Sequence, residues 1–540
     1  MKRAVSQLAL LVLLLVLGAA GTVVALVAQQ PEEAGPPQFT TIPIQDRMRA
    51  VTLENGHIIF VPPVARRAIL HAGDNAPGGN GGGKPGGGGG GGTPSDFNLP
   101  GGVAIVPTVC FPNSTNNYDA TCGKDSYQGE PALAANSALL VGAHNDIYPG
   151  ACSATAPNGG AGDCGLSAAV STSGTTWSRF KLSRQWGGHD FFIGFDPSVA
   201  INSLGHIFVA YGVADGGASG PNGVVVVRSI DGGASWLKSK AVVLNLSGGV
   251  FEDKYWIAAD NRSSGSFKDR LYVAWDRNQG NNQILLVSTS ANHGETWTAP
   301  KKINDGTSKF ERVIYAFPAV APNGNVYVLW YDYARRIIFI DKSANGGSSW
   351  GTDVAVASTN FGFSLDLGCN GGRGMTPAPQ MAIDAGGNIF VAYANQPAGP
   401  GATMDVFITY STNGGASWST PQLVSQTIAG HQFNPAIAID STGRISVSYQ
   451  DRRDDAANCR THTYLSRFSF SGSVLSRDGA DIKVSDADSN FDGNPNGPGD
   501  YQGLACQGAN AHPYFSDHRD ANISLQTGNA GAFEVYTAIK

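Results

Sequence analysis

Charge is scarce in this chain of 540 residues. Only 14% of its residues are charged and the formal net charge is −6, so the chain lacks the clustered basic side chains with which proteins bind nucleic acid. We therefore expect no nucleic-acid partner. Cysteines are also few, and the seven that are present suit an oxidising compartment. Because seven is an odd number, at least one thiol is unpaired in a monomer.

The first 30 residues predict export from the cytoplasm. Lys2 and Arg3 precede an apolar run over residues 8–28, the pattern of a signal sequence or an uncleaved membrane anchor. Small residues at 18–20 offer a cleavage site, which we prefer, although about twenty apolar residues are also long enough to span a bilayer. No cysteine closely follows the run, so a lipidated N-terminus is not indicated. The protein is expected to be secreted, or attached to the membrane outside the cytoplasm.

Two further segments precede the main body of the chain. Residues 31–72 have a mixed composition and no repeat, and we assign them no structure. Residues 73–102 are nearly all glycine, with a few Pro and Asn, and cannot bury enough apolar surface to become ordered. This second segment is predicted to be a flexible tether.

An octapeptide that recurs along the chain organises everything after the tether. It reads Ser-Ile-Asp-Gly-Gly-Ala-Ser-Trp at 229–236 and returns at 290–297, 343–350 and 411–418, with a worn copy that ends at Trp177. A period of about 60 residues indicates one supersecondary unit per repeat. Within each copy, Asp or Asn bonds its own backbone, Gly takes positive φ, and Trp folds under the turn as an apolar plug.

This octapeptide resembles the Asp-box of the sialidase (BNR-repeat) propellers, and that resemblance implies an all-β propeller of four-stranded blades over residues 103–540. The first strand of each unit is predicted at 130–134, 196–201, 255–258, 317–321, 379–383, 434–439 and 501–505. These seven segments predict seven blades, although the sialidases have six, which is the alternative. The last unit ends at a third strand, and its outer strand is expected to come from residues 103–106 or their continuation, which would close the ring.

The propeller fold separates two faces. Loops between the second and third strands gather on one face with the loops that lead to the next blade, and the octapeptide turns lie on the other. The functional site is expected among the loops. Cys369 and Cys459 both fall in long loops on that face, which favours a disulfide between them. Cys110 with Cys122, and Cys152 with Cys164, are close enough in sequence for each pair to staple a loop.

The resemblance also implies a set of catalytic residues, because sialidases use a Tyr nucleophile activated by Glu, an Asp as the acid, and an Arg triad that binds the substrate carboxylate. Tyr501, in Asp-Tyr-Gln-Gly-Leu-Ala, resembles the stretch around the family's nucleophile, although it could equally be an aromatic residue at the rim. Glu252 opens the third unit and Arg277 ends its second strand, as the family's Glu and an Arg do. Asp146 follows the second strand of the first unit, where the acid would lie.

The family's N-terminal Phe/Tyr-Arg-Ile-Pro motif is absent, and no Arg lies between Arg67 and Arg179. An Arg triad would have to be drawn from Arg277, Arg452 or Arg453, and Arg519. However, an Asp directly before or close to an Arg recurs in the third, sixth and seventh units. Such recurrence is what a structural ion pair between neighbouring blades would produce. We favour that alternative for Asp276 and Asp517.

One loop has the spacing of a calcium site. Oxygen ligands stand at alternate positions: Asp486, Asp488, Asn490 and Asp492. The loop lacks the usual Gly at its sixth place, where Phe491 stands, and the usual Glu at its twelfth, where Gly497 stands. A polar loop without metal is therefore the favoured alternative.

These patterns predict an exported glycoside hydrolase of exo-α-sialidase type that acts on sialylated or related glycans and requires no cofactor. The alternative is a non-catalytic propeller that binds a glycan or a protein at the cell surface. The missing N-terminal motif and the long glycine tether both favour that alternative.

Overall fold

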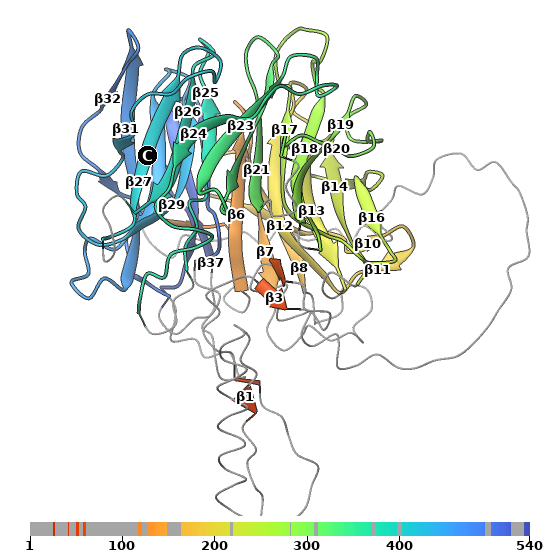
Figure 1. The fold of residues 1–540 in the computed structure, drawn as a ribbon, viewed down its shortest axis with the longest axis horizontal. Helices are drawn as coiled ribbons and strands as arrows, with labels where there is room; N and C mark the ends of the chain where they lie inside the picture. The colour runs from red at the N-terminus through yellow and green to blue at the C-terminus, as the bar shows by residue number, and fades with distance from the viewer. Residues whose placement is uncertain are drawn as a thin grey trace, which may run out of the picture.

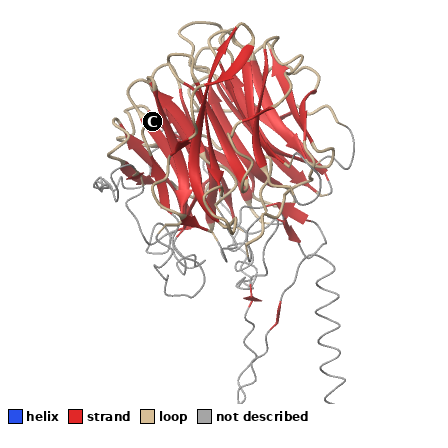
Figure 2. Cartoon of the chain, turned by 90° about the vertical axis from the view of Figure 1, so that its left-hand side faces the viewer, coloured by secondary structure: helices blue, strands red, loops and turns tan. Residues whose placement is uncertain are grey.

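The structure is a computed structural model in which the described residues are 25–26, 41–42, 50–52, 58–60, 117–120, 127–147, 164–215, 220–280, 282–306, 312–369, 374–396, 402–491, 498–519 and 534–540. All regular elements in these ranges are strands (Figure 2). None of the described residues forms a helix long and apolar enough to cross a membrane. The glycine tether lies outside these ranges, and so does the predicted signal or anchor apart from residues 25–26.

The short strands near the N-terminus form two separate ladders. β1 (Ala25–Leu26) pairs with β2 (Thr41–Ile42), and β3 (Ala50–Thr52) pairs with β4 (Ile58–Phe60). None of these four strands is part of the blades described below.

The main body is a ring of seven blades, each an antiparallel sheet. In the first six blades the four main strands follow one another in sequence, and neighbouring blades lie side by side (Figure 1). The first blade is β6 (Tyr127–Ala135), β7 (Leu140–Ile147), β8 (Cys164–Ser171) and β9 (Ser178–Lys181). The hairpin of β10 (Gln185–Trp186) and β11 (His189–Asp190) leads to the second blade, which is β12 (Ile193–Ile201), β13 (Ile207–Ala214), β14 (Asn222–Ser229) and β15 (Leu237–Lys238), with β16 (Val243–Asn245) also paired to β14. The third is β17 (Phe251–Ala259), β18 (Leu271–Gln279), β19 (Asn282–Ser290) and β20 (Lys301–Lys302).

The remaining blades follow the same order. The fourth is β21 (Val313–Val320), β22 (Val326–Asp332), β23 (Ile337–Ser343) and β24 (Val354–Ser358), and the fifth is β25 (Gln380–Ile383), β26 (Ile389–Asn395), β27 (Asp405–Ser411) and β28 (Gln422–Leu423). The sixth is β29 (Gln432–Ile439), β30 (Ile445–Asp451), β31 (Arg460–Ser471) and β32 (Val474–Arg477), with β33 (Ile482–Lys483) and β34 (Ser489–Asn490) also paired to β31. The seventh is β35 (Gly503–Gln507), β36 (Asn510–Asp517), β37 (Glu534–Thr537) and β5 (Tyr118–Asp119).

The predicted all-β propeller of seven blades is confirmed, and the alternative of six blades is wrong. The ring closes as expected, because the last sheet takes its outer strand from the N-terminal side of the array: Tyr118 pairs with Thr537, and Asp119 with Tyr536. The closing strand is the continuation of residues 103–106, which themselves lie outside the described residues. Closure removes the open edge that an unfinished seventh blade would expose.

The octapeptides form the turns between the third and fourth strands of blades two to five. In the second blade, the Asp231 carboxylate accepts the backbone N–H of Ser235 at 2.9 Å, and the Ser229 hydroxyl accepts the N–H of Gly233 at 2.8 Å. The three complete copies repeat both bonds, with Asn in place of Asp. The predicted self-bonded turn is therefore confirmed.

The tryptophans of these turns are buried to different degrees. Trp236 is 7% exposed and Trp177, from the worn copy, is 1% exposed, as a plug should be. Trp297, Trp350 and Trp418 are half-buried and pack on the edge of the hydrophobic core. The prediction of largely buried tryptophans is thus confirmed for the first two and too strong for the other three.

A disulfide joins Cys369, in the long loop between blades four and five, to Cys459 in blade six. The predicted pairing is confirmed, and it fastens the two loops to each other across the end of the fifth blade. Among the described residues Cys506 is a free cysteine, as the odd count required. The two other predicted pairs include residues outside the described ranges.

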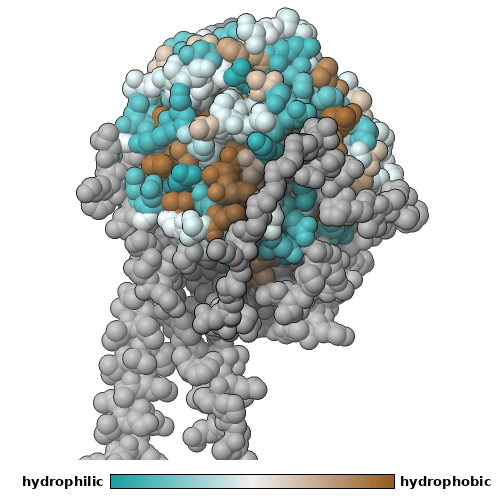
Figure 3. Space-filling model, turned by 90° about the vertical axis from the view of Figure 1, so that its right-hand side faces the viewer, coloured by the Kyte–Doolittle hydropathy of each residue, from teal (hydrophilic) through white to brown (hydrophobic). Residues whose placement is uncertain are grey.

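The outer surface around blades two and three is mixed (Figure 3). Hydrophobic residues form small groups among hydrophilic ones on this face. Large exposed apolar side chains of the described residues are Leu204, Ile230, Leu246, Leu423, Ile428 and Val474. Since apolar atoms make up much of any protein surface, scattered side chains of this kind need no partner to explain them.

Because Trp236 is buried under its turn and Trp297 is half-exposed, the two positions should differ in stability. We expect Trp236→Ala to lower the free energy of unfolding by about 3–5 kcal/mol through the cavity that it leaves. Trp297→Ala, the matched control in the neighbouring blade, should cost less. Thermal and urea unfolding of the two variants will measure this, and equal losses would contradict the assignment of Trp236 as a plug.

Candidate functional site

The innermost strands share one irregularity that builds the centre of the ring. In blades one, two, three, four and six a β-bulge interrupts the pairing with the second strand: two residues of the innermost strand lie opposite one residue of the second. The first of these two residues has positive φ. Ala378 in blade five, two residues before β25, also has positive φ. These residues are Glu130, Asp196, Lys254, Tyr315, Ala378 and Asn434. In blade seven the corresponding position, two residues before the start of β35, is Tyr501.

Positive φ is uncommon for side chains other than Gly and costs about 1–3 kcal/mol at each position. The twelve non-glycine residues with positive φ in the described part of the chain include all six of these, so half of the strained backbone lies at one level of the ring. Strained residues of this kind cluster at functional sites. We call the seven positions the axial ring.

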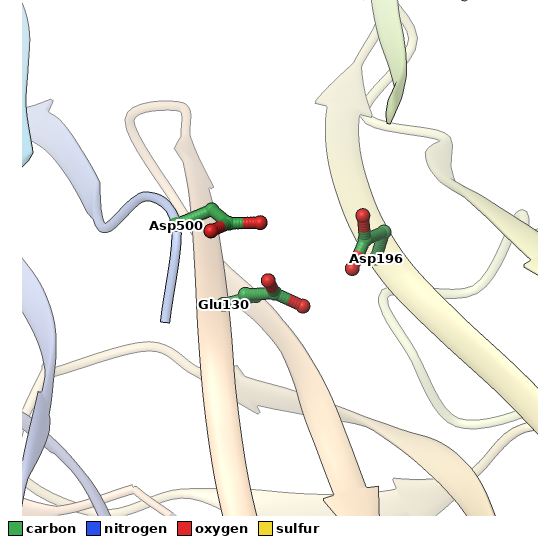
Figure 4. Close-up of side chains that lie close together, drawn as sticks. All are labelled: Glu130, Asp196 and Asp500. Carbon is green, nitrogen blue, oxygen red and sulfur yellow. The ribbon is translucent and has the colours of Figure 1, made fainter. Parts of the chain in front are cut away.

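Lys254 lies among three acidic residues at the axial ring (Figure 4 shows the three acids). Its Nζ lies 2.7 Å from Asp500 Oδ2 and 3.6 Å from Glu130 Oε1, and it donates to Asp196 Oδ2. All four side chains are 1–2% exposed. One oxygen from each acid lies within 4.8 Å of the others, which makes this group the one set of described residues with the compactness of a metal site. The ammonium of Lys254 supplies the positive charge there.

Neighbouring groups hold the acids in place. Asn145 Nδ2 donates to Glu130 Oε2 at 2.6 Å, and Asn145 Oδ1 accepts the backbone N–H of Asp196 at 2.8 Å. Gly499 approaches so closely that a Cβ there would lie 2.9 Å from the Glu130 backbone nitrogen, and its φ is +81°. Only Gly fits this position, which brings Asp500 next to Glu130.

An aromatic depression adjoins the acids. Its lining includes Trp256, Tyr315, Phe317, Tyr501 and the Lys254 side chain. The ring of Trp256 packs on Phe317, with centroids 4.8 Å apart, and edge-on against Tyr501 at 5.1 Å. Flat aromatic faces thus lie next to the polar group around Lys254.

Tyr501, the nucleophile that the resemblance predicts, is part of this site. It is 3% exposed, its ring lies 5.7 Å from Lys254 Nζ, and its hydroxyl donates to the Pro197 carbonyl at 3.1 Å. Tyr501 is thus the predicted catalytic residue that the structure places with the axial acids.

Glu252, the predicted partner of Tyr501, is engaged elsewhere. Its carboxylate accepts from Arg277 Nη2 at 2.5 Å, from Trp275 Nε1 at 2.6 Å and from Asn245 Nδ2 at 2.8 Å. These contacts join strands of blades two and three. Within the described residues the Glu252 carboxylate makes no hydrogen bond to Tyr501.

Asp146, the predicted acid, is completely buried in the first blade. Burial alone would raise the pKa of its carboxyl, but Lys181 at 2.7 Å and the Arg179 guanidinium outweigh burial and lower it. A carboxyl held in its ionised form has no proton to give to a leaving group. This environment does not favour Asp146 as the acid.

The arginines expected to clamp a substrate all have protein partners. Arg453 bonds Asp451 at 2.6 Å and Asp481 at 2.8 Å, and Arg519 bonds Asp486 at 2.6 Å and Asp517 at 2.7 Å. Arg452, 4% exposed, donates to the Leu367 and Asn458 carbonyls. Together with Arg277 on Glu252, they hold the loop face together.

These pairs support the structural interpretation of Asp next to Arg. Asp517 bonds the Arg two residues later, and Asp451 does the same in blade six. The partner of Arg277 in blade three is Glu252 rather than Asp276. The pairs form within one blade in the first two cases, rather than between neighbours.

The described members of the predicted calcium loop have contacts within the protein. Asp486 bonds Arg519, Asp488 bonds His462 Nε2 at 2.6 Å, and the Asn490 carbonyl accepts from His518. Asp492 lies outside the described residues. The Asp486 and Asp488 carboxylates thus both have partners among the protein's own side chains.

The axial acids could have been found from the sequence by one weak signal. Four of the seven first strands carry Pro directly after the axial position, as in Glu130-Pro and Asp196-Pro. Aligned on that Pro, the repeats would have placed Glu130, Asp196, Ala378 and Asn434 at one level. Lys254 has no Pro after it and gives no such signal.

Comparison with known proteins leaves the function open. No family model matches the chain, and no curated protein does. Solved structures with some likeness include the Ruminococcus gnavus intramolecular trans-sialidase in complex with oseltamivir carboxylate, at 13% identity and a TM-score of 0.43, covering 81% of this chain and 98% of that one. Another is the Hadza microbial sialidase Hz136, at 12% identity and a TM-score of 0.41, covering 70% of this chain and 74% of that one. A third is a Penicillium chrysogenum alpha-L-arabinanase complexed with arabinobiose, at 12% identity and a TM-score of 0.42, covering 63% of this chain and 94% of that one. With TM-scores this low, the function has to be argued from the residues of the site.

A buried carboxyl on the loop side of blade five predicts a pH effect. Burial, with a contribution from Asp451, raises the pKa of Asp405 to about 7. Since an unfolded Asp has a pKa of about 3.9, the native state keeps a proton that the unfolded state loses between roughly pH 4 and 7. Stability from this group is therefore complete below pH 4 and lost as the pH rises through 7. Asp405→Asn, which keeps a neutral side chain, should reduce the fall in melting temperature between pH 5 and 8, and parallel curves for the two proteins would refute the assignment.

Proposed function

We propose that this protein is a glycoside hydrolase that binds a sialylated or related glycan at the axial ring. The observation that carries the proposal is the close group of Glu130, Asp196 and Asp500 beside an aromatic depression. A glycosidase whose nucleophile is a tyrosine needs carboxyl groups nearby to take up the tyrosine proton and to protonate the leaving group. One oxygen of each of the three acids lies within 4.8 Å of the others, and Asp500 is the neighbour of Tyr501 in the sequence.

In this proposal the aromatic rings bind the apolar face of the sugar, while Glu130 and Asp500 exchange protons with the leaving group and with water. Tyr501 keeps the role that the resemblance implies, attack on the anomeric carbon. Asp500, its neighbour in sequence, and Glu130, which lies with Asp500 around Lys254, then take the place of Glu252.

A second candidate is a non-catalytic propeller that binds a glycan through the same depression. Two observations favour it: Lys254 already contacts all three acids, and each predicted Arg of a substrate clamp is engaged by the protein. Buried charges that are fully paired stabilise a fold without performing acid–base chemistry.

The two candidates differ in turnover. We expect the purified protein to release the fluorophore from an α-sialoside or a related fluorogenic glycoside, and Tyr501→Phe to lose at least about 100-fold in kcat. Tyr410→Phe is the matched control, because the Tyr410 hydroxyl bonds the Ser473 carbonyl in an exposed position on the octapeptide side. It should keep full activity.

A glycan array completes the test. Binding without turnover, abolished by Trp256→Ala, would establish the binding propeller and overturn the hydrolase. Neither binding nor turnover across sialylated and arabinose-containing glycans would overturn both candidates.

A further inference from the structure

The Lys254 side chain is shut away from water beside an acid of the neighbouring blade. Its Nζ donates to Asp196 Oδ2, and Asp500 and Glu130 stand at 2.7 Å and 3.6 Å. The four side chains are no more than 2% exposed, and the Tyr501 ring covers the ammonium from one side. The amine and the Asp196 carboxyl are therefore held together where little water can compete.

Three carboxylates lie around the ammonium of Lys254 in this group. An ion pair taken out of water loses solvation that its own attraction need not restore. Transfer of one proton from Lys254 Nζ to Asp196 along their existing contact turns the pair into a neutral amine and a carboxylic acid. The amine then has a lone pair and the acid has an electrophilic carbon.

We infer that Lys254 and Asp196 condense to an intramolecular amide bond that joins β17 to β12. The Nζ lone pair attacks the Asp196 carboxyl carbon, and a C–N bond forms. Glu130 accepts the proton that the amine gives up and delivers it to the departing hydroxyl, so that the C–O bond breaks and one water leaves. Glu130 ends as it began, and no oxidant or reductant takes part.

Position selects Asp196 over the other two acids. Asp196 and Lys254 occupy the same bulge position in adjacent innermost strands, and both strands are paired on either side of the bulge. Asp500 belongs to the turn before β35. Fixed placement of this kind gives effective concentrations of about 10⁵–10⁸ M, which favours condensation although water is a product. Glu130, held by Asn145, remains as the proton carrier.

The bond would add a covalent connection between two blades whose backbone hydrogen bonds otherwise run within each sheet. It does not depend on the proposed glycosidase. It leaves Glu130 and Asp500, the two acids given catalytic roles above, as free carboxyls. Failure of the glycan assays would leave this inference standing, and the reverse also holds.

Peptide mapping of the purified full-length protein tests the bond directly. After denaturation, reduction and trypsin digestion, Asp196 lies in the peptide of residues 185–228, and an unmodified Lys254 ends the peptide 241–254. An amide at Lys254 blocks cleavage there. We expect one branched species that joins 185–228 to 241–262 and is lighter than their sum by one water, with peptide 241–254 absent.

Two variants assign the roles. Lys254→Arg keeps the positive charge but removes the nucleophilic amine, and should show no branched species. Glu130→Gln should yield separate peptides because the proton carrier is gone. Recovery of unlinked 185–228 and 241–254 from the wild-type protein would overturn the inference. A link from Lys254 to the peptide that contains Asp500 would overturn the choice of partner, and a linked Glu130→Gln protein would overturn the role of Glu130.

Discussion

A bulge with positive φ near the start of the innermost strand is the constraint on which the centre of this propeller depends. In blades one, two, three, four and six it places one residue of the blade at a common level, and the second-strand residue opposite the bulge is a buried aromatic or His side chain. The strain of about 1–3 kcal/mol at each position persists because regular pairing on both sides leaves the chain no alternative path. Without the bulges the pleat would alternate regularly, and Glu130, Asp196 and Lys254 would not meet.

Desolvation decides how the scarce charge of this chain is used. Ions that leave water need partners, and the described part of the structure supplies them within blades, as for Asp451 with Arg453, and across blades, as for Lys254 with Asp196 and Glu130. The same requirement explains why the arginines that were predicted to bind a substrate carboxylate form ion pairs within the protein instead. An Arg that already bonds two carboxylates, as Arg453 does, has little capacity left for a ligand.

The two halves of the axial site have complementary chemistry. The acids and Lys254 form a polar group, and Trp256, Phe317 and Tyr501 form an apolar surface next to it. A ligand with both hydroxyls and a flat apolar face, such as a sugar, would match both halves. This match, rather than likeness to any solved structure, is the ground on which we propose a glycan ligand.

The sequence by itself determined the repeat, the seven blades and the self-bonded turns, because hairpin turns and strand alternation are encoded within a few residues. The Cys369–Cys459 pair could be favoured only because the predicted propeller puts both loops on one face. It also singled out Tyr501, which stands at the start of a strand in a recognisable stretch. Only the tertiary structure decided the site, since Glu130, Asp196, Lys254 and Asp500 come from distant parts of the chain and meet only when the ring closes. For the same reason the partners of Glu252, Asp146 and the arginines could not be predicted: which charges pair depends on which side chains burial brings together, and local spacing does not contain that information.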